Sequence, residues 1–181
     1  RAAARDAPLP PHTSTLRFDL DGQAWELRAP LDSLHVHGNV GWRCAPLRAR
    51  DRLDAWLQHL VLCADPPAGT QQRTRWLLLD AEQVFAPVSD AHARLAALLR
   101  LVRRGLAEPL RFFPDSAWAC VDRGRDEAQR VWESSEYRRG ESADPAYALA
   151  LRGVAEPLSA DFVEIAHRVY DPLRRALGDE R

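Results

Sequence analysis

The stretch TLRFDLDGQAWELR, residues 15–28, decides how the N-terminal part of the chain folds. At its centre lies Asp21-Gly22, a dipeptide that favours a two-residue turn between antiparallel strands. Such a turn brings four large apolar side chains onto one face: Leu16, Phe18, Trp25 and Leu27. The turn and the apolar pattern require the same pairing, and together they predict a β-hairpin of fixed register.

Two further strand segments are expected after the hairpin. The second hairpin strand is predicted to continue through residues 29–35, with Pro30 placing it at a sheet edge or a bulge. A turn at residues 35–39 and a strand at residues 40–46 then complete an antiparallel meander of three strands. The apolar run at residues 75–79 predicts another strand, with cover on both faces.

Helices are predicted where apolar residues recur at helical spacing or where a helix-starting residue occurs. They are expected to cover residues 49–64 and 90–107 and to begin at Pro114, Pro145 and Ser159. The helix at 90–107 is expected to bury one side, formed by Leu95, Leu98, Leu99, Val102 and Leu106. This order of strands and helices is typical of a layered α/β or α+β domain.

The domain plan is simple. Residues 1–14, rich in Ala, Arg and Pro, predict a linker or disordered end, and residues 15–181 predict a single domain. Within it, residues 122–144 are the most polar and are expected to form a partly helical, mobile excursion. Because the chain begins with Arg1 and contains no Met, we expect a fragment or a processed chain.

Composition excludes several classes of protein. All 25 basic residues are Arg, so a Walker A lysine and a Schiff-base lysine are both excluded. The formal net charge of −1 does not indicate a globally basic nucleic-acid binder. No apolar run approaches the roughly 20 residues of a membrane span, and no signal peptide opens the chain, so we expect a cytoplasmic protein. The three cysteines lack CxxC spacing, which favours reduced thiols over a metal site.

Two constellations near the third strand raise the question of metal chemistry. His35 and His37 share a face of an extended segment, but polar residues at a turn explain them better than a metal site does. Metal-dependent nucleases hold Mg²⁺ with an Asp from one strand and an acid-x-Lys motif from the next. Asp32 could supply the first carboxylate, but the third strand offers Arg43 and Ala45, which are neither acid nor lysine.

Arginine is dense in several places, and two interpretations stay open. The ordinary one is a solvated surface with ion pairs, and the other is contact with DNA phosphates or an acidic partner. Trp132, Tyr137 and Tyr147 likewise either anchor a partner surface or pack on the domain's own core. The residues proposed for DNA or partner contact are Arg48, Arg50, Arg52, Arg73, Arg75, Arg103, Arg104 and Trp132.

The segments DRLDAWLQHLVLCA (51–64) and SADFVEIAHRVYDPLR (159–174) resemble the C-terminal part of RecC proteins. RecC is the gamma subunit of exodeoxyribonuclease V, the RecBCD helicase–nuclease. PLRFFPDSAW (109–118) and RRGESADPAYALALRG (138–153) support the resemblance. It spans nearly all of the chain from Thr15, and its specificity lies in the order and spacing of these segments rather than in catalytic motifs.

This resemblance implies a PD-(D/E)XK nuclease-like fold, a small mixed sheet flanked by helices, with a degenerate active site. Asp32 falls near the metal-binding Asp of the nuclease pattern, Arg43 near its second acid and Ala45 near its lysine. The domain is therefore expected to have no nuclease activity, no metal and no cofactor.

The resemblance also implies a role. We expect a non-catalytic scaffold and DNA-guiding domain that works with RecB-like and RecD-like subunits and DNA in double-strand-break repair by homologous recombination. Two alternatives stay open. One is an active Mg²⁺-dependent nuclease with a displaced acid, drawn from Glu26, Asp32 and Asp80. The other is a stand-alone Arg-rich DNA-binding module.

Overall fold

A computed structural model describes residues 7–177. They divide into two compact units, one of residues 7–100 with 176 and 177, and one of residues 101–175. The expected domain of residues 15–181 is thus built from two units, which are described separately below. Residues 1–6 of the expected linker lie outside the described part of the chain.

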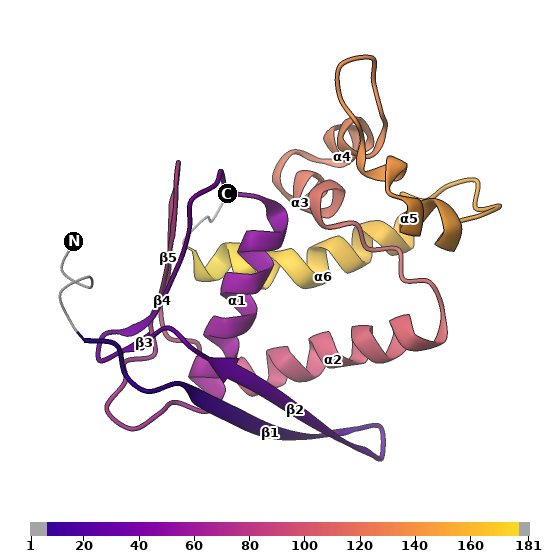
Figure 1. The fold of residues 1–181 in the computed structure, drawn as a ribbon. Coiled ribbons are helices and arrows are strands. Elements are labelled where there is room, and N and C mark those ends of the chain that lie inside the picture. The colour runs from indigo at the N-terminus through magenta and orange to yellow at the C-terminus, as the bar shows by residue number, and fades with distance from the viewer. Residues whose placement is uncertain (1–6, 178–181) are drawn as a thin grey trace. The chain divides into compact units, whose positions relative to one another are not determined.

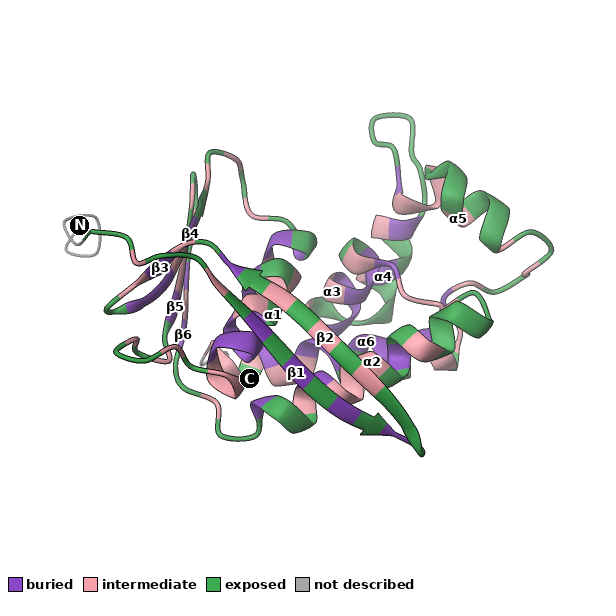
Figure 2. Ribbon diagram, turned by 60° about the horizontal axis from the view of Figure 1, so that its bottom comes forward, coloured by how far each residue is buried: buried purple, intermediate pink, exposed green. Residues whose placement is uncertain are grey.

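The first unit opens with the predicted hairpin. Strands β1 (His12–Leu20) and β2 (Gln23–Leu31) pair antiparallel with Phe18 opposite Trp25, so the predicted register is confirmed. Asp21 and Gly22 both have positive φ, as a two-residue hairpin turn requires. Buried and exposed residues alternate along β1 (Figure 2). β1 begins at His12 rather than Thr15, so the strand includes the last residues of the segment predicted as linker.

A second, four-stranded sheet follows in the order β3-β4-β5-β6. The pairs β3–β4 and β5–β6 are antiparallel, whereas β4–β5 is parallel. Its strands are β3 (Leu34–His35), β4 (Gly38–Arg43), β5 (Thr74–Leu78) and β6 (Glu82–Phe85). The predicted three-stranded meander is therefore wrong, because β2 pairs only with β1 and β4 takes β5 as its parallel neighbour.

Two glycines of β4 permit close backbone and ring packing. Gly38 has a φ of 118°, and a Cβ there would collide with the backbone carbonyl of Arg73. That carbonyl accepts a hydrogen bond from the Asn39 N–H at 2.9 Å, which joins β4 to β5. At Gly41 a Cβ would meet the indole ring of Trp76, so this ring lies directly against the β4 backbone. Each glycine is thus required by packing.

Helix α1 (Ala49–Ala64) matches its prediction at both ends and covers one face of the four-stranded sheet. The rings of Trp56, His59 and Phe85 stack on one another with centroid distances of 5.3 to 5.9 Å. The expected cover on both faces of β5 is wrong, since Leu77 and Leu79 are exposed. Figure 1 shows the sheet nearly edge-on, with α1 beside one face.

Helix α2 (Ala91–Ala107) runs from the first unit into the second. At its start, His92 stacks on Phe18 of the hairpin. The predicted apolar side is only partly confirmed: Leu95 is buried, whereas Val102 and Leu106 are 52% and 76% exposed. An apolar stripe is buried only where another element packs on it, and the last two turns of α2 carry apolar side chains into solvent.

The second unit is helical and packs around Phe113. Its helices are α3 (Pro114–Arg123), α4 (Arg125–Trp132), the 3₁₀ turn η2 (Glu141–Ala143), α5 (Pro145–Ala150) and α6 (Ala160–Ala176). The predicted starts at Pro114 and Pro145 are confirmed, and the helix predicted from Ser159 begins at Ala160. Phe113 contacts the rings of Trp132, Tyr147 and Phe162. The polar stretch 122–144 is partly helical, as predicted, because it contains α4.

Candidate functional site

Arg43, which the family resemblance predicts to lie near the second acid of the nuclease pattern, forms an ion pair. Arg43, the last residue of β4, places Nη1 at 2.8 Å from Oδ1 of Asp51 in the first turn of α1. The other carboxylate oxygen of Asp51 accepts the backbone N–H of Arg48 at 2.9 Å, which caps the helix. The Asp51 side chain is only 4% exposed. Both carboxylate oxygens of Asp51 are thus used in structural contacts, one with Arg43 and one with the start of α1.

Sequence reasoning missed Asp51, although a signal for it existed. It lies three residues after Arg48, at the N3 position where an acidic side chain caps a helix start. An acid in the first turn is also favoured by the helix dipole. Because buried carboxylates are stable only when paired, the arginine at the end of β4 was the partner to look for.

Asp32 lies at a small pocket beside the end of β2. It follows β2, is exposed, and lines a pocket of about 180 Å³ together with Trp42, Gln58 and Trp76, where it is the only acidic lining residue. Ala45 lies in the loop after β4, where its carbonyl accepts the Leu79 N–H at 3.2 Å. Nothing in this arrangement brings a second carboxylate to Asp32.

The other acids and histidines considered above do not form a metal cluster. Glu26 is paired with Arg28 at 2.6 Å, and Asp80 accepts the Leu47 backbone N–H at 3.0 Å. Within residues 7–177, no group of three or more His, Cys, Asp or Glu side chains has the geometry to hold a metal ion. His35 and His37 fall under the same finding.

Some of the arginines proposed for DNA or partner contact are held by carboxylates. Arg75 pairs with Glu82 at 2.7 Å across β5 and β6. Arg104 forms two hydrogen bonds of 2.9 Å with Asp161 and another with Glu108, and these raise the pKa of its guanidinium further above its usual range. Such bidentate pairing satisfies the guanidinium geometry that a phosphate would otherwise use.

Other arginines remain available at the surface. Arg48, Arg50 and Arg73 have exposed side chains, and within the described part of the chain none of their guanidinium groups forms an ion pair with a carboxylate. The two remaining residues of this group, Arg52 and Arg103, are half-buried. The first three therefore have the electrostatic freedom that contact with phosphates requires.

The three aromatic residues left open by the sequence have different surroundings. Trp132 is 8% exposed and its ring centroid lies 4.2 Å from that of Phe113, so its ring packs in the core of the second unit. Tyr147 is half-buried and meets Phe113 edge-on at 5.0 Å. Tyr137 is 91% exposed. Of the three, Tyr137 alone presents its ring as a surface anchor.

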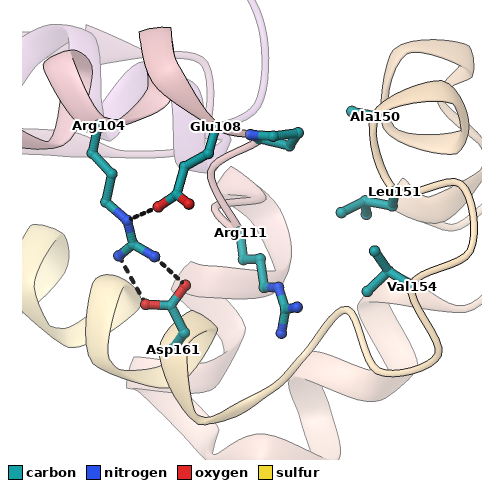
Figure 3. Close-up of a pocket in the computed structure, with 8 residues that line it drawn as sticks. Arg104, Glu108, Arg111, Ala150, Leu151, Val154 and Asp161 are labelled. Carbon is teal, nitrogen blue, oxygen red and sulfur yellow. Dashed lines mark hydrogen bonds and ion pairs between the residues drawn. The ribbon is translucent and has the colours of Figure 1, made fainter.

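A pocket of about 400 Å³ lies in the second unit (Figure 3). The Arg104–Asp161 pair lines one side, and the aliphatic side chains of Leu151 and Val154 line the other. Arg111 lies between them and donates from Nη1 to the Ser159 hydroxyl at 2.6 Å. Sequence reasoning gave no role to Arg111, because a single arginine between Leu110 and Phe112 carries no recognisable pattern.

A buried histidine ties α1 to the sheet. His59 donates from Nε2 to the Ala86 carbonyl at 2.8 Å, and its Nδ1 lies 3.1 Å from the Thr74 hydroxyl. Burial lowers the pKa of His59 to about 4 and raises the pKa of the neighbouring Cys63 thiol. His59 is therefore neutral near pH 7, and its fully buried side chain serves packing.

The fold and the site define a mixed α/β protein with a small mixed sheet, in which Arg43 at the end of β4 forms an ion pair with Asp51 of α1. A model of the RecC C-terminal domain family matches residues 1–125, and the chain belongs to this family. The chain is similar to the RecBCD enzyme subunit RecC of Escherichia coli strain K12, with 26% identity over 89% of its own length. It spans 16% of the length of that relative. Within the described residues, no helix is long and apolar enough to cross a membrane.

Proposed function

We propose that this chain is a non-catalytic scaffold and DNA-guiding domain of a RecBCD-type, ATP-dependent helicase–nuclease. Membership of the RecC C-terminal domain family supports the proposal, as does similarity to a relative that is named as a subunit of the RecBCD enzyme. The work of such an enzyme is double-strand-break repair by homologous recombination, in the cytoplasm. The domain belongs to a subunit of a DNA hydrolase without itself cutting DNA.

The Arg43–Asp51 pair is the observation that carries the non-catalytic part of the proposal. In a metal-dependent nuclease, two carboxylates bind Mg²⁺ and a lysine stabilises charge at the attacking water. Here Arg43 brings positive charge to the position of the second acid, Ala45 stands near the position of the lysine, and the chain has no lysine. A guanidinium paired with Asp51 cannot serve as a second ligand for a divalent cation, and Asp32 is the only acidic residue that lines its pocket.

The proposed partners are RecB-like and RecD-like subunits and DNA. Exposed Tyr137 has the character of a protein-contact anchor, since aromatic rings dominate the energy of protein interfaces. The arginines proposed first for DNA contact are the exposed Arg48, Arg50 and Arg73. The half-buried Arg52 and Arg103 remain secondary candidates. Arg75 and Arg104 are set aside because carboxylates already hold them.

Co-purification with the RecB-like and RecD-like subunits of the same organism tests the scaffold role. We expect one or both to remain bound to this chain, or to the full-length RecC-type subunit that contains it, through size-exclusion chromatography. The matched variant Tyr137→Ala should weaken retention, whereas Leu149→Ala, at another exposed site, should leave it unchanged. Loss of both partners in the full-length subunit would contradict the scaffold proposal.

A nuclease assay tests the proposal that the domain does not cut DNA. Linear duplex and single-stranded DNA are incubated with the chain in Mg²⁺ and in Mn²⁺, and we expect no cleavage. Cleavage that disappears in Asp32→Ala would instead establish a displaced-acid nuclease. Micromolar or tighter DNA binding by the chain alone, with steep dependence on salt, would establish a stand-alone DNA-binding module.

A further inference from the structure

One face of the four-stranded sheet is apolar and open to solvent. Trp42 on β4 is 72% exposed, and Leu77, its register partner on β5, is 37% exposed. Leu79, two residues beyond Leu77, is 74% exposed. We call these three residues the outer sheet face. Single exposed apolar residues are ordinary, but a tryptophan and two leucines at adjoining positions of one sheet mark an interaction surface.

The opposite face of the same sheet is closed. There Thr74 and Phe85 are fully buried under α1, and Gln83 is 4% exposed. The sheet is mixed, and β4–β5 is its parallel pair, a kind of pairing that occurs mostly where both faces are covered. The exposed apolar side chains beside this pair therefore suit a covering layer.

Charge on the outer sheet face favours a protein as that layer. The charged pair beside it, Arg75 and Glu82, is mutually neutral, with N–O distances of 2.7 and 2.9 Å. DNA binds through uncompensated cations, and on this face the described strands β4, β5 and β6 carry only the paired Arg75. Apolar protein surface matches the exposed indole and leucine side chains.

The course of the chain identifies which protein surface is nearest. The Leu9 N–H donates to the Leu34 carbonyl at 2.7 Å, so the N-terminal segment runs along β3, the edge strand beside β4. In a RecC-type protein, a C-terminal domain is preceded by the rest of the polypeptide. This chain spans only 16% of the length of its RecC relative. In a RecC-type protein, the preceding polypeptide would therefore lead into the domain at the edge strand β3.

We propose that the outer sheet face is an intramolecular docking surface, covered in a RecC-type protein by an apolar part of the polypeptide that precedes this domain. The proposal depends on the family membership and not on the scaffold or DNA-guiding role. Such docking would fix the position of the domain within its own subunit before any partner subunit binds. Trp42 would be the central anchor, because a buried aromatic ring contributes most to such an interface.

Hydroxyl-radical footprinting read by mass spectrometry tests the proposal without any mutation. Oxidation of Trp42, Leu77 and Leu79 is compared between the 181-residue chain and the full-length RecC-type subunit, each without partner subunits. We expect the oxidation rate of Trp42 to fall severalfold in the full-length subunit, because the core of an interface excludes water. Tyr137, 91% exposed, is the internal control and should react equally in both.

The other outcomes each overturn the proposal. Equal oxidation of Trp42 in both proteins would show that the face stays open. Protection that appears only when RecB-like or RecD-like subunits are added would assign the face to a partner. Protection that rises with concentration in the 181-residue chain alone would assign it to a second copy. None of these readouts depends on nuclease activity or on partner retention, so failure here is distinct from failure of the proposed function.

A pair of variants gives an independent measurement. Trp42→Ser and Leu79→Ser each remove apolar surface that is exposed in this chain, so both should leave its thermal midpoint nearly unchanged. In the full-length subunit they should speed proteolytic cleavage before His12 at least severalfold, because the domain would no longer dock through the outer sheet face. Leu149→Ser, at an equally exposed site in the second unit, is the matched control. Unchanged cleavage in both variants would overturn the proposal.

Discussion

Arg43 and Asp51 are joined at 2.8 Å in a pair where the acid is almost fully buried and the guanidinium is 40% exposed. The asymmetry matters because the buried partner pays the larger desolvation cost and also caps α1. The pair thus links the end of β4 to the start of the helix that covers the sheet.

Asp51→Ala should destabilise the chain by about 2 kcal/mol, since it removes a helix cap and the carboxylate that pairs with Arg43 together. Asp51→Asn keeps a capping oxygen and should cost about half as much. Urea unfolding followed by circular dichroism measures both. A cost below that of the exposed control Asp54→Ala would contradict a structural role for the pair.

The free energy of unfolding should fall as the pH drops below 6.5, because the His59 ring binds a proton in the unfolded chain before it does so in the folded chain. Its pKa is about 4 in the folded chain against 6.5 when solvated, so the unfolded chain binds the proton more tightly. The stability that His59 contributes is fully present above pH 6.5 and is lost as the pH falls towards 4. The loss amounts to about 3 kcal/mol, from 1.36 kcal/mol for each pKa unit.

Unfolding measured from pH 7 to pH 4 checks this dependence, and His59→Gln should flatten it. The variant keeps a donor for the Ala86 carbonyl but has no titrating ring. An NMR titration of the histidine ring supplies the direct measurement. A His59 signal that titrates near pH 6.5 would contradict the burial described here.

The local elements were predictable because short-range chemistry determines them. Asp21-Gly22 fixed the hairpin register, and the apolar spacing of α1 located Ala49–Ala64 at both ends. The sheet topology was not predictable in the same way. A strand such as β4 carries no mark that chooses between β2 and β5 as its neighbour, because pairing depends on contacts distant in sequence.

The candidate site was predictable only in its outline. The absence of lysine and the presence of Arg43 are visible in the sequence, and they indicated a degenerate nuclease position. Which arginines are held by acids was not visible, because Arg104 meets Asp161 across 57 residues of chain. Trp132 was ambiguous for the same reason, since its burial depends on the distant ring of Phe162 through Phe113.

Glu141 should make the second unit less stable as the pH rises above about 4.5. Its carboxylate accepts the backbone N–H groups of Ser116 and Asp115 at 2.8 and 3.2 Å and so caps α3. Burial nevertheless raises its pKa above the usual 4.5. An acid with a raised folded pKa contributes stability that is fully present below its unfolded pKa and is lost as the pH rises through its folded pKa.

Comparison of the wild-type chain with Glu141→Gln isolates this effect. The difference in unfolding free energy should shift in favour of the variant as the pH rises from 4.5, because glutamine carries no charge to desolvate. Glu136→Gln, at an exposed site, removes the same charge as a control. A difference that moves the opposite way would show that hydrogen bonding to the α3 N-terminus outweighs burial.

Surface arginines should differ in their effect on DNA binding according to whether an acid holds them. Arg48→Ala, Arg50→Ala and Arg73→Ala should each weaken binding and lower the salt slope of the binding constant by about 0.9. Arg75→Ala and Arg104→Ala should leave the slope unchanged, because Glu82 and Asp161 already neutralise those side chains. Fluorescence anisotropy with labelled DNA, over a range of salt concentrations, measures the slope for the assembled complex. Equal losses in both groups would refute the distinction.

Trp132 and Tyr137 lie five residues apart, yet substitution should affect different properties at the two positions. Trp132→Ala should destabilise the second unit by about 3 to 5 kcal/mol, because it empties a site packed against Phe113. Tyr137→Ala, at a 91% exposed position, should change stability by less than about 0.5 kcal/mol. Thermal unfolding and co-purification with the RecB-like and RecD-like subunits are measured on the same two variants. Tyr137→Ala should then lose partner retention while keeping its unfolding midpoint, and a stable variant with full retention would remove Tyr137 from the proposed partner surface.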